Sequence, residues 1–150
     1  MVSLRPLSEG NRQAVEALRV SPSQERFVSS VAQSLREAAE HPDARGLCWA
    51  VYADDTPVGF VMISDEVWSA EYLSQFLWKL LIDERFQRQG FGTATLDLIV
   101  DYFRRRPGVE VLTTSAGEGD GSPIAFYERY GFKRTGEMMH GEVVLGLRIA

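Results

Sequence analysis

The chain has 150 residues, of which 45% are hydrophobic and 25% charged, a composition typical of one globular domain with its own hydrophobic core. Its formal net charge of −5 argues against nucleic acid as a partner, because binding to a phosphate backbone requires a basic surface. The single cysteine, Cys48, lies in an apolar run and excludes an internal disulfide, so we expect a core residue in a reducing compartment.

The N-terminal residues and the hydropathy of the chain predict a cytoplasmic protein without membrane contacts. Residues 1–6 lack the apolar segment of a signal peptide. No apolar run approaches the length of a transmembrane helix. Because no internal repeat, linker or low-complexity segment interrupts the sequence, we expect a single domain over residues 1–150.

Hydrophobic periodicity and turn residues predict strands and helices that alternate along the chain. We expect strands at residues 2–7, 46–54, 58–64, 72–82, 109–115, 132–139 and 142–149. We expect helices at residues 11–19, 21–40, 91–106 and 122–130. The resulting order, β-α-α-β-β-β-α-β-α-β-β, predicts an α/β (α+β) fold with a mixed sheet covered by helices.

Two of these helices carry clear boundary and packing signals. Ser21, Pro22 and Gln24 form a helix start, with a capping serine, a proline in the first turn and a glutamine that completes a capping box. We therefore expect one continuous helix over residues 21–40. The central helix has an apolar stripe that we expect to face the sheet, made of Phe91, Ala94, Leu98, Ile99 and Tyr102.

The segment between the strand at 72–82 and the central helix has the features of an anion-binding loop. The first N–H groups of a helix have no internal partners, and the helix dipole adds partial positive charge there. Gly90 and Gly92 allow the backbone to approach a ligand closely. The Walker pattern is absent, and Thr95 stands where the Rossmann pattern needs its third glycine. The remaining pattern, Gln87-x-x-Gly90-x-Gly92, predicts a phosphate or pyrophosphate site.

This loop resembles the pyrophosphate loop of the GNAT N-acetyltransferase superfamily, and the order of elements resembles the GNAT fold from end to end. A second motif, residues 126–132 (FYERYGF), is similar to the tyrosine-bearing helix and following strand of that family. The resemblance implies a mixed, mostly antiparallel central sheet flanked by helices, acetyl-CoA as co-substrate and no metal. One departure is Asp120, where the family often carries Asn, so we assign no ligand role to this residue.

The resemblance also implies roles for individual residues in acyl transfer from a thioester to an amine. The backbone of Leu80, Leu81 and Ile82 would pair with the pantetheine arm, and an N–H near Leu81 would polarise the thioester carbonyl. Tyr127 would be the general acid for the departing thiolate, because a phenol with a pKa of ~10 is protonated at neutral pH. The diphosphate would be held by the loop residues Gln87, Arg88, Gln89, Gly90, Phe91, Gly92 and Thr93.

A narrower resemblance is to the bacterial spermine/spermidine (diamine) N-acetyltransferases. It rests on short matches over most of the chain: Val20-Ser21 with Gln24, Ser34-Leu35, Glu37-Ala38, Val58-Gly59-Phe60, residues 81–87, Tyr127 with Gly131-Phe132, and Gly141-Glu142. It implies direct attack by a primary amine of a polyamine, and we also expect a homodimer. The alternatives are a GNAT enzyme for a peptide N-terminus, a lysine side chain, an amino acid or an aminoglycoside, and a non-catalytic acyl-CoA sensor.

A polyamine site needs carboxylates for ion pairs and aromatic faces for cation–π contacts. The candidates for this site are the acidic residues Glu25, Asp65, Glu66 and Glu142 and the aromatic residues Trp68, Tyr72 and Trp78. Because side chains alternate along a strand, Lys79 is expected to point away from the site if Trp78 points toward it.

The general base is left open by the sequence. An alkylamine with a pKa of ~10.4 must lose a proton, directly or through water, before it attacks the thioester. Asp83, Glu84, Glu66 and Glu142 are the carboxylates that we consider for this step.

Overall fold

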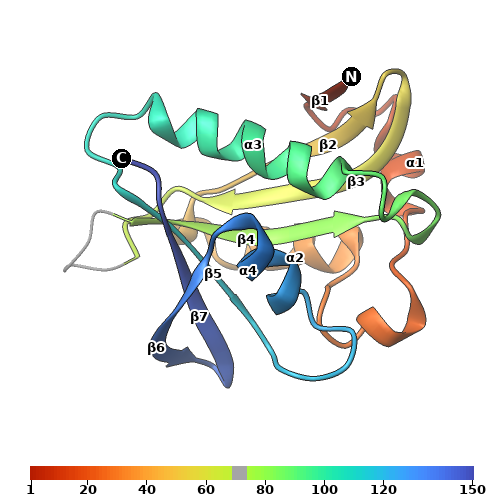
Figure 1. Cartoon of the computed structure of the whole chain (residues 1–150). Helices are drawn as coiled ribbons and strands as arrows, with labels where there is room; N and C mark the ends of the chain where they lie inside the picture. The colour runs from red at the N-terminus through yellow and green to blue at the C-terminus, as the bar shows by residue number, and fades with distance from the viewer. Residues whose placement is uncertain (69–73) are drawn as a thin grey trace.

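The computed structural model, which describes residues 1–68 and 74–150, has a central sheet with helices on both faces (Figure 1). The strands are β1 Val2–Arg5, β2 Gly46–Ala53, β3 Thr56–Ser64, β4 Ser74–Ile82, β5 Val111–Ala116, β6 Lys133–Met139 and β7 Glu142–Arg148. The helices are α1 Arg12–Glu16, α2 Val31–Glu40, α3 Phe91–Arg104 and α4 Ile124–Tyr130, with short 3₁₀ helices η1 Pro22–Gln24, η2 Pro42–Ala44 and η3 Glu84–Phe86. The predicted order of strands and α-helices is confirmed; Tyr72, expected in the fourth strand and in the acceptor site, lies outside the described residues.

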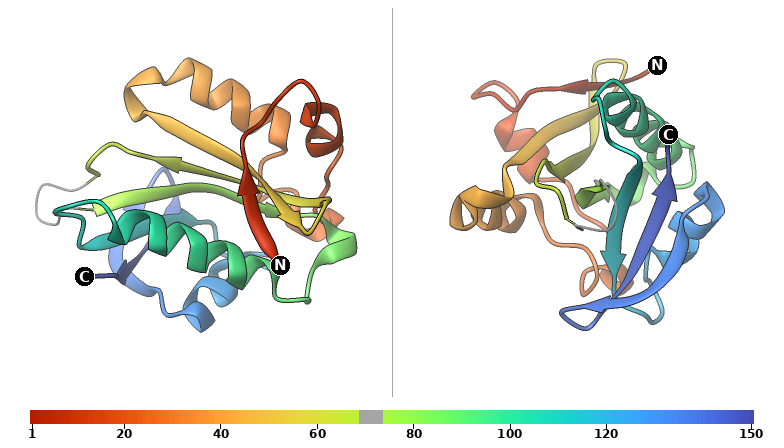
Figure 2. Two further views of the ribbon diagram at one scale, coloured as in Figure 1. Left: turned by 90° about the horizontal axis from the view of Figure 1, so that it is seen from above. Right: turned by 90° about the vertical axis from the view of Figure 1, so that its left-hand side faces the viewer.

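The strand order in the sheet is β1-β2-β3-β4-β5-β7-β6. Neighbouring strands pair antiparallel except β4 and β5, which are parallel. Helices α1 and α2 cover one face, and α3 and α4 cover the other (Figure 2). This arrangement confirms the predicted mixed, mostly antiparallel sheet flanked by helices. In the described part of the chain, no helix combines the length and the hydropathy needed to cross a bilayer.

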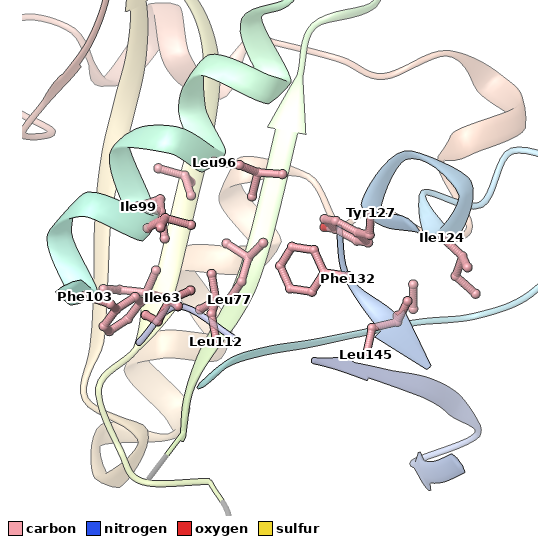
Figure 3. Close-up of a cluster of buried hydrophobic side chains, with 14 of the residues drawn as sticks. Ile63, Leu77, Leu96, Ile99, Phe103, Leu112, Ile124, Tyr127, Phe132 and Leu145 are labelled. Atoms are coloured by element: carbon pink, nitrogen blue, oxygen red, sulfur yellow. The ribbon is translucent and has the colours of Figure 1, made fainter. Parts of the chain in front are cut away.

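Helix α3 packs on the sheet through a different stripe from the predicted one. The buried residues of α3 are Thr95, Leu96, Ile99, Val100 and Phe103. The other predicted stripe residues, Phe91, Ala94, Leu98 and Tyr102, are only half-buried at the edges of the contact. Apolar side chains occur around most of this helix, so periodicity alone does not select the buried face. The sheet selects it instead, because Leu96, Ile99 and Phe103 pack in one cluster with residues of β3, β4 and β5 (Figure 3).

The predicted continuous helix over residues 21–40 is wrong in its first half. The capping box of Ser21 and Gln24 is present, but it starts only the single turn of η1. Helix α2 begins after Ser30, whose Oγ accepts a hydrogen bond from the N–H of Gln33 at 3.1 Å. Because this second cap starts the helix at Val31, residues 25–30 are not part of α2.

The two parallel strands at the centre of the sheet separate partway along their length. They pair only over residues 74–77 of β4 and 111–114 of β5. At the next residue, Trp78, β4 bulges, and its register with β3 shifts between Met62 and Ile63. Beyond this bulge, no strand of the described chain pairs with the edge of β4 that faces β5. The result is an opening between β4 and β5.

Candidate active site

A cavity of about 1300 Å³ extends from the open edge of β4, along the N-terminal end of α3, to helix α4. The residues expected to bind acetyl-CoA line this cavity, with the exception of Leu81 and Gln89. Tyr127 lines the same cavity. The fold therefore brings the glycine loop and the tyrosine motif, which lie far apart in the sequence, to one site.

The loop before α3 places backbone N–H groups at the cavity wall. Phe91, Gly92 and Thr93 form the first turn of α3, so their N–H groups have no carbonyl partner within the helix. Gly90 caps the helix with a φ of 84°, in the left-handed region that favours glycine. A Cβ on Gly92 would lie 3.0 Å from the ring of Phe126, so this glycine lets α4 pack against the loop. The arrangement is suited to bind phosphate oxygens.

The side chain of Gln87 lines the cavity and is hydrogen-bonded within the protein. Its Nε2 donates hydrogen bonds to the carbonyl of Ile82 at 2.8 Å and to Oε1 of Gln24 at 2.9 Å. Its Oε1 accepts a hydrogen bond from Nε2 of Gln24 at 3.2 Å. Gln87 thus fixes the loop to β4 and to η1. The hydrogen bonds between Gln24 and Gln87 were not predicted, because the capping-box pattern gives no information about contacts distant in the sequence.

Residues 21–30 cross from the glycine loop to the loop that joins β5 and α4. Gln24 makes the contact with the glycine loop, and Arg26 Nη2 donates a hydrogen bond to the carbonyl of Asp120 at 3.1 Å. A Cβ on Gly121 would lie only 2.0 Å from the carbonyl oxygen of Ser23, so these two segments are in close contact. Residues 21–30 therefore cover one side of the opening between β4 and β5.

Beyond the bulge, Leu80 and Ile82 present backbone groups to the opening. The N–H of Asp83 donates to the carbonyl of Val58 on β3. Because the direction of hydrogen bonding alternates along an antiparallel strand, Leu81 faces β3, whereas Leu80 and Ile82 face the opening. The carbonyl of Ile82 already accepts a hydrogen bond from Nε2 of Gln87. Within the described chain, this leaves the N–H groups of Leu80 and Ile82 and the carbonyl of Leu80 available to a ligand.

Tyr127 lies near the point where β4 and β5 separate. Thr114, in the last β4–β5 pair, donates its hydroxyl to the carbonyl of Leu77 at 2.9 Å. Burial raises the pKa of Tyr127 to about 12; the Thr114 hydroxyl acts to lower it, and the charge of Glu142 acts to raise it. The hydroxyl of Tyr127 is turned toward β4 (Figure 3). The phenol therefore keeps its proton at physiological pH and lies close enough to Glu142 to be influenced by its charge.

Asp83, one of the expected base candidates, is occupied by structural hydrogen bonds. Its side chain accepts from the Arg85 Nε at 2.8 Å and from the backbone N–H groups of Arg85 and Arg19 at 2.9 Å each. Burial acts to raise the pKa of Asp83, but these hydrogen bonds and the charge of Arg85 outweigh it and hold the pKa below its usual range. Asp83 therefore stabilises the turn after β4 as an anion.

The other acidic candidates differ in how close they lie to Tyr127. Glu84 is exposed in η3, and Glu66 is exposed after β3, at the opposite end of β4 from the glycine loop. Glu142, at the start of β7, is half-buried and accepts a hydrogen bond from Ser115 Oγ at 2.7 Å. Of the base candidates, Glu142 is the one whose charge reaches the phenol of Tyr127.

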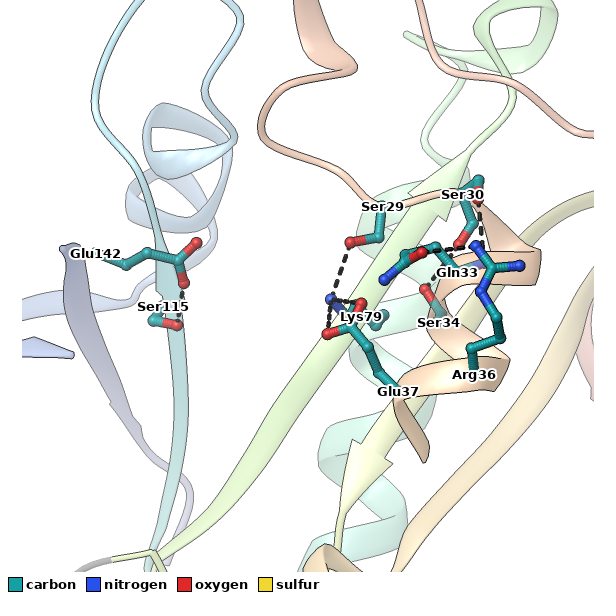
Figure 4. A network of polar contacts seen from close by, with 9 residues as sticks. All are labelled: Ser29, Ser30, Gln33, Ser34, Arg36, Glu37, Lys79, Ser115 and Glu142. Carbon is teal, nitrogen blue, oxygen red and sulfur yellow. Dashed lines mark hydrogen bonds and ion pairs between the residues drawn. The ribbon is translucent and has the colours of Figure 1, made fainter. Parts of the chain in front are cut away.

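Of the residues expected to bind the amine, those that the structure describes (Glu25, Asp65, Glu66, Trp68, Trp78 and Glu142) do not line this cavity. Glu25 is exposed, although its neighbour Gln24 lines the cavity. Trp78 packs near α2, since its ring would contact a Cβ built on Gly46 at 3.3 Å, where Ala38 is equally close. Glu142 and Ser115 lie on β7 and β5, across from Lys79 on β4 (Figure 4).

The prediction that Lys79 points away from Trp78 is wrong. The bulge at Trp78 interrupts the alternation of side chains, so both residues reach toward α2. The Nζ of Lys79 lies 3.2 Å from each carboxylate oxygen of Glu37 and 2.9 Å from Oγ of Ser29. Glu37 was not among the predicted site residues, although Glu37-Ala38 contributes to the narrower resemblance.

Metal and thiol groups make no further site in the described chain. Within residues 1–68 and 74–150, no cluster of three or more His, Cys, Asp or Glu side chains is arranged to hold a metal ion. Cys48 is half-buried; burial raises the pKa of its thiol, and the nearby charge of Arg12 acts in the opposite direction.

Comparison with known proteins finds relatives over nearly the whole chain. The model of the Acetyltransferase (GNAT) family matches residues 12–132. The chain is 25% identical over 148 residues to the spermine/spermidine N(1)-acetyltransferase of Bacillus subtilis (strain 168), with 96% of each protein covered.

Solved structures of acetyltransferases share this fold. An acetyltransferase from Thermus thermophilus aligns with a TM-score of 0.74 and 19% identity, over 99% of this chain and 97% of that one. The PaiA N-acetyltransferase from Thermoplasma acidophilum, in complex with coenzyme A, aligns with a TM-score of 0.69 and 16% identity, over 99% of each chain.

Proposed function

Because the chain belongs to the GNAT acetyltransferase family, we propose that it transfers the acetyl group of acetyl-CoA to a primary amine of a polyamine such as spermidine or spermine. The observation that carries this proposal is the single cavity that joins the glycine loop, the open edge of β4 and Tyr127. The choice of a polyamine is supported by the likeness to the Bacillus subtilis spermine/spermidine N(1)-acetyltransferase.

The chain offers a matched set of groups for acetyl-CoA. The N–H groups of Phe91, Gly92 and Thr93 would donate to the diphosphate, with added positive charge from the N-terminus of α3. Leu80 and Ile82 would pair with the pantetheine arm as if it were an added strand. The N–H that polarises the thioester carbonyl would come from Leu80 or Ile82, because the backbone groups of Leu81 face β3.

Transfer by direct attack also needs a proton acceptor for the amine and a proton donor for the thiolate. Glu142 would accept the extra proton of the ammonium, directly or through water, before the neutral amine attacks. As the C–N bond forms and the C–S bond breaks, Tyr127 would donate its proton to the sulfur and regain one from the attacking nitrogen. A phenol with a pKa of about 12 is a weak acid. Burial also raises the basicity of a thiolate formed beside the phenol, which lowers the cost of this proton transfer.

Two other functions would use the same cofactor site. One is a GNAT enzyme that acetylates a peptide N-terminus, a lysine side chain, an amino acid or an aminoglycoside. It would differ only in the residues that bind the amine. A non-catalytic acyl-CoA sensor would need the loop but no proton donor. The position of Tyr127 on the cavity favours an enzyme over a sensor.

The test is release of the CoA thiol from acetyl-CoA in the presence of spermidine, spermine, a peptide with a free N-terminus, lysine and an aminoglycoside. We expect turnover with spermidine or spermine at a higher kcat/KM than with the other amines. A higher kcat/KM with peptides would contradict the polyamine assignment. Binding of acetyl-CoA, measured by calorimetry, without turnover on any amine would favour the sensor.

We further propose that the protein acts as a cytoplasmic homodimer, on the basis of the narrower resemblance. Light scattering of the purified protein at micromolar concentration should give twice the mass of the chain. A mass equal to that of one chain at all concentrations would contradict the dimer. Cell fractionation should recover the protein with the cytoplasm, and recovery with the membrane pellet would contradict that location.

A further inference from the structure

Lys79, Glu37 and Ser29 form a half-buried polar cluster where β4 meets α2 (Figure 4). The ammonium of Lys79 lies 3.2 Å from both oxygens of Glu37, and the side chains of Lys79 and Glu37 are 17% and 26% exposed. Ser29 completes the cluster at 2.9 Å from Nζ. At this degree of burial, an ion pair is less weakened by water and salt than one on the open surface.

The cluster stands at the edge of the opening between β4 and β5. Lys79 follows the bulge and is two positions beyond Leu77, the last residue of β4 that pairs with β5. Across the opening, Ser115 and Glu142 form the second polar group, on β5 and β7 (Figure 4). Glu37 and Glu142 thus lie on opposite sides of the opening (Figure 4), and Lys79 already neutralises Glu37. Neither carboxylate lines the cavity described above.

We propose that Glu37 is a second ammonium site beside the opening between β4 and β5, and that Lys79 is its built-in occupant and a specificity-determining residue. This inference rests on the proposed amine acetyltransferase function. The lysine ammonium is chemically equivalent to one end of a polyamine, and Glu37 with Ser29 already binds it in the manner expected for such a ligand.

The physical basis of the specificity is competition between a tethered and a free ammonium. Because Lys79 is part of the chain, it faces Glu37 at an effective concentration in the millimolar range or above. A polyamine that uses Glu142 for one end must displace Lys79 to place a second ammonium on Glu37. A monoamine has no second ammonium and does not meet this competition. Lys79 therefore reduces the advantage of polyamines over monoamines.

The test compares spermidine with butylamine in steady-state kinetics at saturating acetyl-CoA. In Lys79→Met, the ratio of the KM for spermidine to the KM for butylamine should fall about tenfold, the scale of one partly desolvated ion pair. Lys79→Arg keeps a cation on Glu37 and should retain the wild-type ratio. The double variant Lys79→Met/Glu37→Gln removes both charges and should return the ratio to about the wild-type value.

A purely structural ion pair between α2 and β4 would give a different result. Lys79→Met would then lower the melting temperature and leave the ratio of KM values unchanged, which would overturn the inference. If Lys79→Met does not fold, Lys79→Gln keeps a hydrogen-bond donor near Glu37 and is measured in its place. If the wild-type protein acetylates neither amine, the proposed function fails separately. The inference is then judged by calorimetry of both amines on Lys79→Met, where equal affinities would overturn it and tighter binding of spermidine would support it.

Discussion

The side-chain amides of Gln24 and Gln87 exchange a pair of hydrogen bonds, at 3.2 Å and 2.9 Å, and so join η1 to the loop before α3. Gln87 adds a third hydrogen bond, to the carbonyl of Ile82 at 2.8 Å. The amide of Gln87 therefore connects three parts of the site. These are the loop proposed to hold the diphosphate, the strand β4 proposed to hold the pantetheine arm, and residues 21–30, which cover one side of the opening. Gln87 is thus a positioning residue, and its side chain is fully used inside the protein.

Replacement of Gln87 by Ala should weaken acetyl-CoA binding without removing the chemistry. The loop loses three hydrogen bonds, each with a net contribution of about 1 kcal/mol, and we expect the KM for acetyl-CoA to rise about tenfold while kcat changes less. Gln24→Ala is the comparison variant: it also removes the capping-box bond from the Ser21 N–H, at 3.1 Å, but it leaves the bond to Ile82 in place and should raise KM by a smaller factor. An equal effect of the two variants would show that the bond to Ile82 does not matter.

Tyr127→Phe should lower kcat about 10²-fold, the lower end of the range for loss of a general acid. The ring that packs among buried residues of the core remains, so the affinity for acetyl-CoA and the melting temperature should change little. Tyr130→Phe is the control on the same helix, because the hydroxyl of Tyr130 donates a hydrogen bond to Asp97 at 2.6 Å. The kcat of the Tyr130→Phe variant should stay near the wild-type value. Steady-state kinetics with saturating acetyl-CoA measures both variants. Undiminished kcat in Tyr127→Phe would remove the phenol from the mechanism.

Features that depend on local sequence could be predicted, and features that depend on distant contacts could not. The element order and the loop around Gly90 follow from periodicity, turn residues and caps, which act within a few residues. The direction of Lys79 depends on a bulge that β3 imposes on β4. The partner of Gln24 lies 63 residues away in the sequence. The buried face of α3 is chosen by the sheet, because apolar side chains occur on several of its faces.

Asp83→Asn should destabilise the fold by about 2 kcal/mol at pH 7, because a buried anion that accepts hydrogen bonds from Arg85 and from two backbone N–H groups is replaced by an amide. The pKa of Asp83 is lower in the folded state than its ordinary value of 3.8. Its contribution is therefore complete at pH values above 3.8 and is lost as the pH falls through the folded-state pKa.

The measurement for Asp83 is urea unfolding of wild type and Asp83→Asn at pH 7 and pH 3. The difference in the free energy of unfolding should be larger at pH 7. A difference that is the same at both pH values would mean that the ionised carboxylate contributes no stability of its own. Glu84→Gln, at an exposed neighbouring position, is the control for the loss of one negative charge and should not alter the free energy of unfolding measurably.

Gly92→Ala and Gly90→Ala should act on the glycine loop in different ways. A Cβ at position 92 meets the Phe126 ring at 3.0 Å, so α4 must shift by a few tenths of an ångström, and we expect the KM for acetyl-CoA to rise about tenfold. At position 90 there is open space, but the φ of 84° disfavours alanine and should cost about 1 kcal/mol of stability. Thermal melts and acetyl-CoA kinetics separate the two effects. A Gly92→Ala enzyme with wild-type KM would show that the ring of Phe126 can move without disturbing the loop.

Glu142→Gln should mainly impair use of the amine. If Glu142 takes the proton of the amine, its amide analogue cannot, and kcat/KM for spermidine should fall about 10²-fold at neutral pH, whereas the KM for acetyl-CoA should rise less than threefold. Ser115→Ala tests the same site more mildly. It removes the 2.7 Å hydrogen bond to Glu142 but keeps the charge, so we expect a loss of only a few-fold. If Glu142→Gln retained wild-type kcat/KM for spermidine, the proton would have to leave by another route, and Glu142 would be excluded as the base.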